Sequence, residues 1–165
     1  MKRPVTLITG ASAGIGHALA HVFARHGHEL VLVARREQRL AEIADAIAAA
    51  GYKRPIVLPV DLARPDAADC IGDTLTMLDI EPDIVVNNAG FGLVGAAAEI
   101  NAAEQLAIID LNVRALTDLS LCFIEPLQRR RGGILNVASV AGFLPGPGMA
   151  VYHATKAYVL SFTEA

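Results

Sequence analysis

The chain contains 165 residues, of which 53% are hydrophobic and 19% are charged, and its formal net charge is −3. This length fits one domain, and the composition excludes a disordered chain, which combines low hydrophobicity with high net charge. The slightly acidic balance gives no support to nucleic-acid binding through bulk electrostatics. No uncharged apolar stretch is long enough for a membrane span. From the charge balance and from this absence, we expect neither nucleic acid nor a membrane as a partner.

Short apolar runs alternate with helical patterns along the whole chain. In chain order they predict strand 5–9, helix 15–25, strand 29–34, helix 37–50, strand 56–60, helix 67–78, strand 83–87, helix 102–130, strand 133–138 and helix 151–165. Pro126 is expected to kink the fourth helix or to end its regular part. The alternation implies a parallel sheet with helices on both faces, so we expect residues 1–165 to form a single, doubly wound α/β domain.

The two cysteines, Cys70 and Cys122, both fall within predicted helices. Two such residues cannot form a disulfide framework, so we expect free thiols. Free thiols indicate a reducing compartment, which favours the cytoplasm.

A glycine-rich loop joins the first strand to the first helix. Its spacing is G-x-x-x-G-x-G rather than the G-x-G-x-x-G of the common dinucleotide fingerprint. Glycine allows a sharp turn and a close approach to a phosphate, and the helix N-terminus supplies free N–H groups and a favourable dipole. An ordinary strand–turn–helix connection is the alternative interpretation. The cofactor-binding residues expected in this loop are Gly10, Ser12, Ala13, Gly14, Ile15 and Gly16.

The loop, Thr-Gly-x-x-x-Gly-Ile-Gly, resembles the cofactor loop of the short-chain dehydrogenase/reductase family. The family's other motifs follow in the same order, as Asp61-Leu62, Asn87-Asn88-Ala89-Gly90, Asn112, Ser139, and Tyr152 with Lys156. The resemblance covers the whole chain and implies a three-layered, Rossmann-like fold with strand order 3-2-1-4-5. It also implies that Asp61 and Leu62 flank the adenine, and that Asn88, Ala89 and Gly90 shape the cofactor cleft.

Relatives in this family normally continue with two further strands. We therefore expect the chain to be incomplete at its C-terminus, with strand 133–138 left as an exposed hydrophobic edge. Self-association that covers this edge is one expected outcome, and the family also implies a homo-oligomer.

The end of the second strand bears on which nicotinamide cofactor binds. An NAD site usually places an acidic residue there, but this chain has Ala34 followed by Arg35 and Arg36. Two cations just before a helix N-terminus oppose its dipole by about 0.3–1 kcal/mol each, and a 2′-phosphate would turn that cost into a gain. A solvated pair of arginines is the alternative. We expect NADP(H) rather than NAD(H), with a hydroxyl contact from Ser12.

Tyr152 and Lys156 are four residues apart, so a helix places them on one face. Moving a tyrosine from its ordinary pKa of about 10 to about 7 takes about 4 kcal/mol. A unit charge about 4 Å away, at an effective dielectric constant of about 20, supplies an effect of this size. The spacing also occurs by chance on many helices. We nevertheless expect Lys156 to stabilise the phenolate of Tyr152, and by family resemblance to bind the nicotinamide ribose.

Ser139 and Asn112 complete the expected catalytic set. Ser139 ends the fifth strand at the carboxyl edge, where open α/β sheets bind ligands, and it would orient the substrate oxygen. Asn112 lies on the apolar stripe of the long helix, where a buried amide needs partners. It either caps neighbouring backbone or, as the resemblance implies, holds a water in a proton relay from Lys156.

The function expected from these residues is an NADP(H)-dependent oxidoreductase that acts on a small carbonyl or alcohol substrate. The alternative is a cofactor-binding fragment or pseudoenzyme without turnover. No metal site is expected, because no Cys or carboxylate joins the pair His17 and His21 at ligand spacing. The cationic run 129–131 is expected to stabilise the C-terminus of the long helix.

Overall fold

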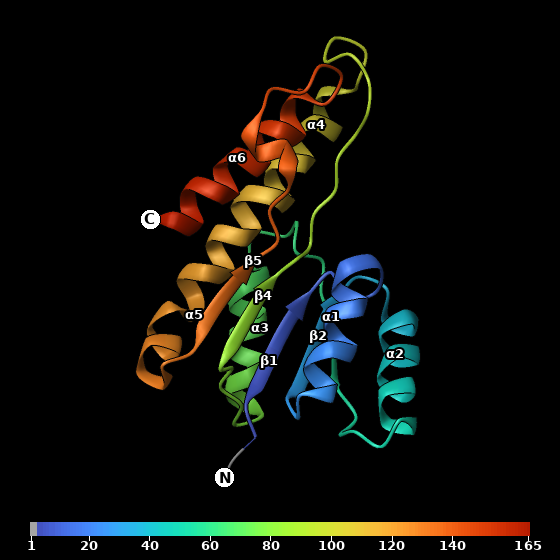
Figure 1. Ribbon diagram of the computed structural model, residues 1–165, viewed down its shortest axis with the longest axis vertical. Helices are drawn as coiled ribbons and strands as arrows, with labels where there is room; N and C mark the ends of the chain where they lie inside the picture. The colour runs from blue at the N-terminus through green and yellow to red at the C-terminus, as the bar shows by residue number, and fades with distance from the viewer. Residues whose placement is uncertain (1–2) are drawn as a thin grey trace.

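The computed structural model describes residues 3–165. Its centre is a five-stranded sheet in the order β3-β2-β1-β4-β5, and every neighbouring pair is parallel (Figure 1). This confirms the predicted strand order. The strands are β1 (Val5–Thr9), β2 (Glu29–Ala34), β3 (Ile56–Pro59), β4 (Ile84–Asn87) and β5 (Gly133–Asn136).

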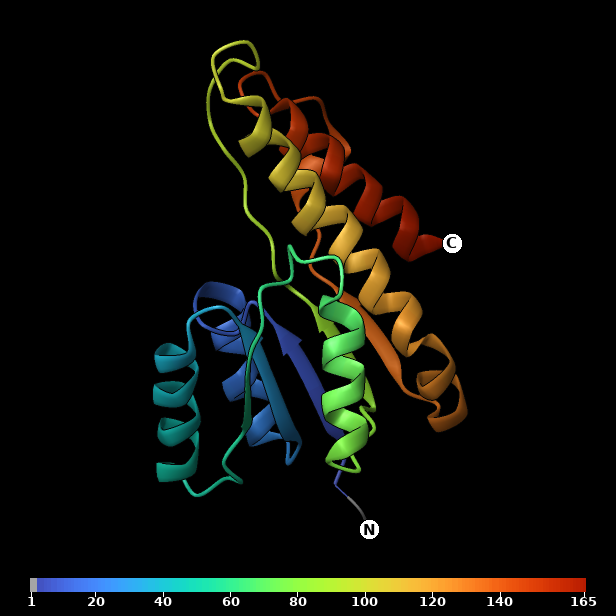
Figure 2. The ribbon, with the colours of Figure 1, turned by 180° about the vertical axis from the view of Figure 1, so that it is seen from behind.

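Helices cover both faces of the sheet, as the doubly wound pattern predicts (Figures 1 and 2). One face carries α1 (Gly14–Arg25) and α2 (Glu37–Ala49), and the other carries α3 (Ala67–Met77) and α5 (Leu116–Arg130). Beyond the carboxyl ends of the strands lie α4 (Ala102–Ile109) and the short 3₁₀ helix η2 (Val140–Phe143). The last helix, α6 (Ala150–Glu164), packs on α4 and η2.

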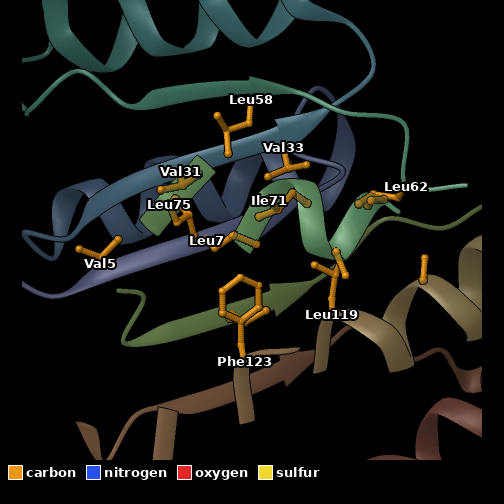
Figure 3. Close-up of a cluster of buried hydrophobic side chains, with 14 of the residues drawn as sticks. Val5, Leu7, Val31, Val33, Leu58, Leu62, Ile71, Leu75, Leu119 and Phe123 are labelled. Atoms are coloured by element: carbon orange, nitrogen blue, oxygen red, sulfur yellow. The ribbon is translucent and has the colours of Figure 1, made fainter. Parts of the chain in front are cut away.

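The core divides into two clusters because successive side chains of a strand point to opposite faces. Leu7 and its neighbours in β2 pack toward Ile71 of α3 and Phe123 of α5 (Figure 3). The adjacent Ile8 packs on the α1–α2 side. All five residues of β1 are buried, so the first strand sits at the middle of the molecule and positions the loop that follows it.

The long helix predicted over 102–130 is present without a break, but it is not α-helical throughout. Residues Asp110–Ala115 form a π-helical segment, η1, between α4 and α5. Such segments are rare and frequently occur at functional sites, and this one contains Asn112. The predicted helix was correct in its bounds, but the periodicity of the apolar residues did not reveal the extra residue in this π-helical turn.

Pro126 neither ends α5 nor stops its regular part, which continues to Arg130. A proline inside a helix loses one backbone hydrogen bond. However, Phe123 and Leu127 remain 4% and 3% exposed on either side of it and hold this turn against the core. The last helical residue is Arg130, and Arg131 caps the helix in a left-handed conformation with a φ of 55°.

As predicted, β5 lies at the edge of the sheet in the described residues, where it pairs with β4. Leu135 is 39% exposed there. The strand ends at Asn136 rather than at residue 138, although the Val137 N–H still donates to the Asn87 carbonyl at 2.9 Å. Within residues 3–165, no helix is both long enough and apolar enough to cross a membrane.

Candidate active site

The loops at the carboxyl ends of all five strands surround one cleft of about 860 Å³. This volume lies within the range of about 300–1,000 Å³ that ligand sites usually have. The cleft brings together nearly all of the predicted cofactor-binding residues: Gly10, Ser12, Ala13, Gly14, Ile15, Arg35, Arg36, Asp61, Leu62, Asn88, Ala89, Gly90, Tyr152 and Lys156. Gly16, Ser139 and Asn112 do not line it.

Gly16 lies beneath the glycine loop instead of facing the cleft. A Cβ at this position would lie 2.6 Å from the Gly10 carbonyl oxygen and would also contact the side-chain amide of Asn88. The structure thus gives Gly16 a packing role, and its contact with the cofactor stays a prediction. The missing side chain lets the start of α1 approach the loop closely. Gly10 itself has a φ of +63°, which favours glycine.

Thr9 and Asn88 hold the glycine loop against the end of β4. The Thr9 hydroxyl accepts hydrogen bonds from the backbone N–H groups of Asn88 (2.9 Å) and Ala89 (3.1 Å), and donates to the Val86 carbonyl (3.1 Å). In return, the Asn88 side chain donates to the Thr9 carbonyl at 2.9 Å. Sequence reasoning missed the role of Thr9, and the signal was a polar residue at the end of an otherwise apolar buried strand.

Arg36 lies directly beside the glycine loop. Its guanidinium donates to the Ser12 hydroxyl at 3.0 Å and to the Ser12 carbonyl at 3.4 Å. The Ser12 hydroxyl thus serves as an acceptor for Arg36. Neither Arg35 nor Arg36 forms an ion pair with a carboxylate among residues 3–165, and both are exposed in the cleft. These two cations are therefore free to pair with an anionic group of a ligand.

Tyr152 and Lys156 share one face of α6, as their spacing predicts, and both line the cleft. Lys156 is 6% exposed, and its Nζ donates to the Val137 carbonyl at 2.7 Å. The same Nζ lies 5.8 Å from the centre of the Tyr152 ring. Burial lowers the pKa of Lys156, because water that would solvate the ammonium is excluded.

Asn112 is 1% exposed and binds the segment that follows β4. Its Oδ1 accepts from the Phe91 N–H at 3.0 Å, and its Nδ2 donates to the Phe91 carbonyl at 2.9 Å and to the Thr155 hydroxyl at 3.1 Å. The amide thereby joins η1 to both the Phe91 segment and α6. This geometry matches the simpler of the two sequence interpretations, an amide that caps backbone groups.

Two residues, Val137 and Ala138, separate Ser139 from the end of β5, and both of them line the cleft. The Ser139 hydroxyl accepts from the Ala141 N–H at 3.2 Å and caps η2. The residue lies at the expected edge of the sheet, but it does not end the strand.

Gly92 is a second residue that sequence reasoning missed. A Cβ on Gly92 would lie 2.7 Å from Cδ2 of the Tyr152 ring and 3.2 Å from the Met149 methyl group. The backbone here is therefore in direct contact with the tyrosine. The signal in the sequence was the alternation of glycines at 90 and 92 with an aromatic residue between them.

His17 and His21 lie on α1, with their Nε2 atoms 3.1 Å apart. Burial lowers the pKa of His17, and the charges of His21 and Arg39 add to this effect. In the part of the chain that the structure describes, no group of three or more His, Cys, Asp or Glu side chains is arranged to hold a metal ion.

The sequence model of the family described as short chain dehydrogenase matches residues 4–165. The chain belongs to this family. It is 38% identical over 168 residues to an 11-beta-hydroxysteroid dehydrogenase of Pinus massoniana, a match that spans 99% of this chain and 46% of the relative. The chain thus spans about half the length of that relative.

Solved structures of this family agree closely with the fold. A short-chain dehydrogenase from Sphingobium yanoikuyae in complex with NADPH is 39% identical, with a TM-score of 0.90 over 98% of this chain and 63% of that one. A family member from Burkholderia phymatum in complex with NAD is 32% identical, with a TM-score of 0.90 over 99% of this chain and 58% of that one. Both types of nicotinamide cofactor therefore occur among the structural neighbours.

Proposed function

We propose that this chain forms the cofactor-binding and catalytic part of an NADP(H)-dependent oxidoreductase that interconverts a carbonyl compound and an alcohol. The observation that carries the proposal is a single cleft with the glycine loop and two unpaired arginines at one end and Tyr152 with Lys156 at the other. A binding module that only held a dinucleotide would need no tyrosine beside a buried lysine.

The residues present fit a nicotinamide dinucleotide. The glycine loop opens onto the N-terminus of α1, where Gly14 has a φ of +55° and open space where a Cβ would project. Such a junction presents N–H groups and a positive dipole to a phosphate. Asp61 and Leu62 line the part of the cleft assigned to the adenine. A nicotinamide cofactor bound here would supply or accept the hydride.

The arginines favour NADP(H) over NAD(H). Ala34 leaves no carboxylate at the end of β2 to bind a ribose 2′-hydroxyl, whereas Arg35 and Arg36 project into the cleft without an acidic partner among the described residues. Guanidinium groups match phosphate geometry well. The NADPH bound in the Sphingobium yanoikuyae relative agrees with this preference. The Burkholderia phymatum relative binds NAD, so the preference of this chain for NADP(H) has to be measured.

In the proposed reaction, Tyr152 gives a proton to the substrate oxygen or takes one from it. The ammonium of Lys156, held in place by the Val137 carbonyl, stabilises the phenolate of Tyr152. The family resemblance assigns Ser139 to orient the substrate oxygen through its hydroxyl and Asn112 to hold a water in a proton relay from Lys156. The Ser139 hydroxyl now accepts from the Ala141 N–H, and the Asn112 amide binds the Phe91 backbone. Residues of the chain thus position the substrate oxygen and move the proton.

Replacing Tyr152 with phenylalanine tests this function, and Tyr158 on the same helix offers a matched control. The Tyr158 hydroxyl bonds to Thr117 and does not line the cleft. General acid–base catalysis contributes about 10²–10⁴-fold, so we expect Tyr152→Phe to lower turnover by at least about 100-fold while NADPH still binds. Tyr158→Phe should keep its turnover.

The measurement is NADPH oxidation with a panel of ketones and aldehydes, beside a fluorescence titration of NADPH. Undiminished turnover in Tyr152→Phe would contradict the assignment. NADPH binding without oxidation in the unmodified chain would favour the alternative, a cofactor-binding fragment or pseudoenzyme.

The assembly and the compartment are also inferred. Leu121 and Ile124 are 60% and 41% exposed on α5, which supports a homo-oligomer that covers this helix. Cys70 and Cys122 are free thiols, which supports the cytoplasm. Sedimentation velocity measures the oligomeric state directly and so tests the first of these inferences.

A further inference from the structure

Two chain segments form the walls around Tyr152, one between β4 and α4 and the other between β5 and α6. They lie side by side at one end of the molecule (Figures 1 and 2), and the Gly95 N–H donates to the Gly148 carbonyl at 2.8 Å to join them. Met149 and the Tyr152 ring both lie against Gly92. A substrate oxygen that reaches the Tyr152 hydroxyl therefore meets the side chains of these two segments.

Neither segment carries a Lys or Arg residue, and their one acidic residue is the exposed Glu99, just before α4. Apart from Glu99, the side-chain hydrogen-bonding residues of the ranges 84–99 and 132–155 are serine, asparagine, histidine, threonine and tyrosine. Phe91 and Leu93 contribute large apolar side chains to the cleft itself. Val94 and Phe143 add further apolar surface on the same segments, with exposed fractions of 82% and 74%.

Two charged residues line the cleft away from its glycine-loop end. Lys156 is almost fully buried, and its ammonium is bound by the Val137 carbonyl. Glu104 is an exposed carboxylate in the first turn of α4 and repels other anions. His153 follows Tyr152, but its Nδ1 faces the Leu144 carbonyl at 2.8 Å and its ring packs on Gly146. Within residues 3–165, the Tyr152 end of the cleft thus offers no exposed cation.

We propose that this end of the cleft takes a neutral, apolar ketone or aldehyde, or the corresponding alcohol, and discriminates against carboxylates, sulfonates and phosphate esters. The inference rests on the oxidoreductase function proposed above. An anionic substituent placed between these walls loses its water without gaining a cationic partner, and that desolvation is strongly unfavourable. An apolar substituent gains from leaving water. The same cleft therefore combines a cationic end for the cofactor with an end that offers the substrate no exposed cation.

A matched pair of ketones separates charge from shape. Acetophenone and 4-acetylbenzoate share the aryl ketone and differ by one carboxylate. We expect the 165-residue chain to use acetophenone with a kcat/KM at least about 100-fold higher, which corresponds to about 2.7 kcal/mol. Saturation-transfer NMR on the NADPH-loaded chain should show the same order of binding, and it does not depend on turnover.

Two variants test whether the charge of the walls causes this preference. Leu93→Arg adds a cation to the cleft and should improve the use and binding of 4-acetylbenzoate relative to acetophenone by about tenfold or more. Leu106→Arg adds the same charge at a site that is 60% exposed and does not line the cleft, and should not change the ratio. Glu104→Gln replaces an exposed side chain, preserves the fold, and should shift the ratio in the same direction as Leu93→Arg by a smaller factor.

The outcomes distinguish the two proposals. Absence of NADPH binding contradicts the oxidoreductase function itself. Where NADPH binds, equal or stronger binding of 4-acetylbenzoate overturns the substrate inference, and so does binding of neither ketone. An unchanged ratio in both Leu93→Arg and Glu104→Gln also overturns it.

Discussion

The contact between Gly92 and Tyr152 leads to a quantitative prediction about catalysis. Replacing Gly92 with alanine places a methyl group 2.7 Å from Cδ2 of the Tyr152 ring, whereas ordinary contacts begin at 3.4 Å. The ring and the backbone must therefore separate by about 0.7 Å. The Met149 methyl group, 3.2 Å from the same point, narrows the directions in which the ring can move.

Misplacing a catalytic group by about 1 Å can cost about 10²-fold in rate. A shift of about 0.7 Å should therefore lower kcat by about 10–100-fold. NADPH affinity should change by less than about threefold, because Gly92 does not line the cleft and the glycine loop and arginines lie at its other end. The expected pattern is thus a loss in kcat without a loss of cofactor binding.

The assay is steady-state NADPH oxidation, with thermal unfolding and NADPH titration measured on the same preparations. Gly133→Ala is the matched control, because a Cβ at Gly133 meets nothing within 4 Å and its φ is not positive. Turnover in Gly92→Ala equal to that in Gly133→Ala would refute the argument. A parallel loss of NADPH affinity would also refute it, because it would show a general collapse of the cleft.

Three further predictions concern the cofactor, the glycine loop and pH. Hydrogen bonds to charged groups contribute about 1.5–3 kcal/mol, so Arg36→Gln should weaken NADPH binding by about 10–100-fold and leave NADH binding nearly unchanged, while Arg25→Gln on α1 should change neither. Thr9→Val removes the acceptor of the Ala89 N–H, whereas the Asn88 N–H keeps the Val86 carbonyl at 3.1 Å, and it should lower the free energy of unfolding by about 1–3 kcal/mol in urea titrations. Burial lowers the pKa of His28 below 6.5 in the folded chain. The unfolded chain therefore takes up this proton first as the pH falls below about 6.5, and stability is lost until the lower, folded pKa is reached. His28→Gln should reduce this loss, and urea midpoints that keep the same slope between about pH 5 and pH 7 would contradict the assignment.

Local patterns in the chain were enough to predict the sheet and the position of the cleft. The run 5–9 is apolar throughout because β1 is buried on both faces, and its observed bounds, Val5–Thr9, match the prediction. Gly10, Gly14 and the Tyr152–Lys156 pair were identified from spacing together with the family resemblance, and they line the cleft because parallel strands place their carboxyl ends at one edge. Periodicity reports burial within each element, and the topology rules then bring these ends together.

Contacts between distant segments required the tertiary structure. Thr9 bonds to residues nearly eighty positions away, and Asn112 bonds to Phe91 on another segment. The cap that Ser139 forms on η2 and the packing of Gly16 beneath the glycine loop were likewise not predicted from local patterns. A buried polar side chain must find some partner, and its residue type and spacing do not specify which one. The partner depends on which backbone groups the folded chain leaves unpaired within about 3 Å of that side chain.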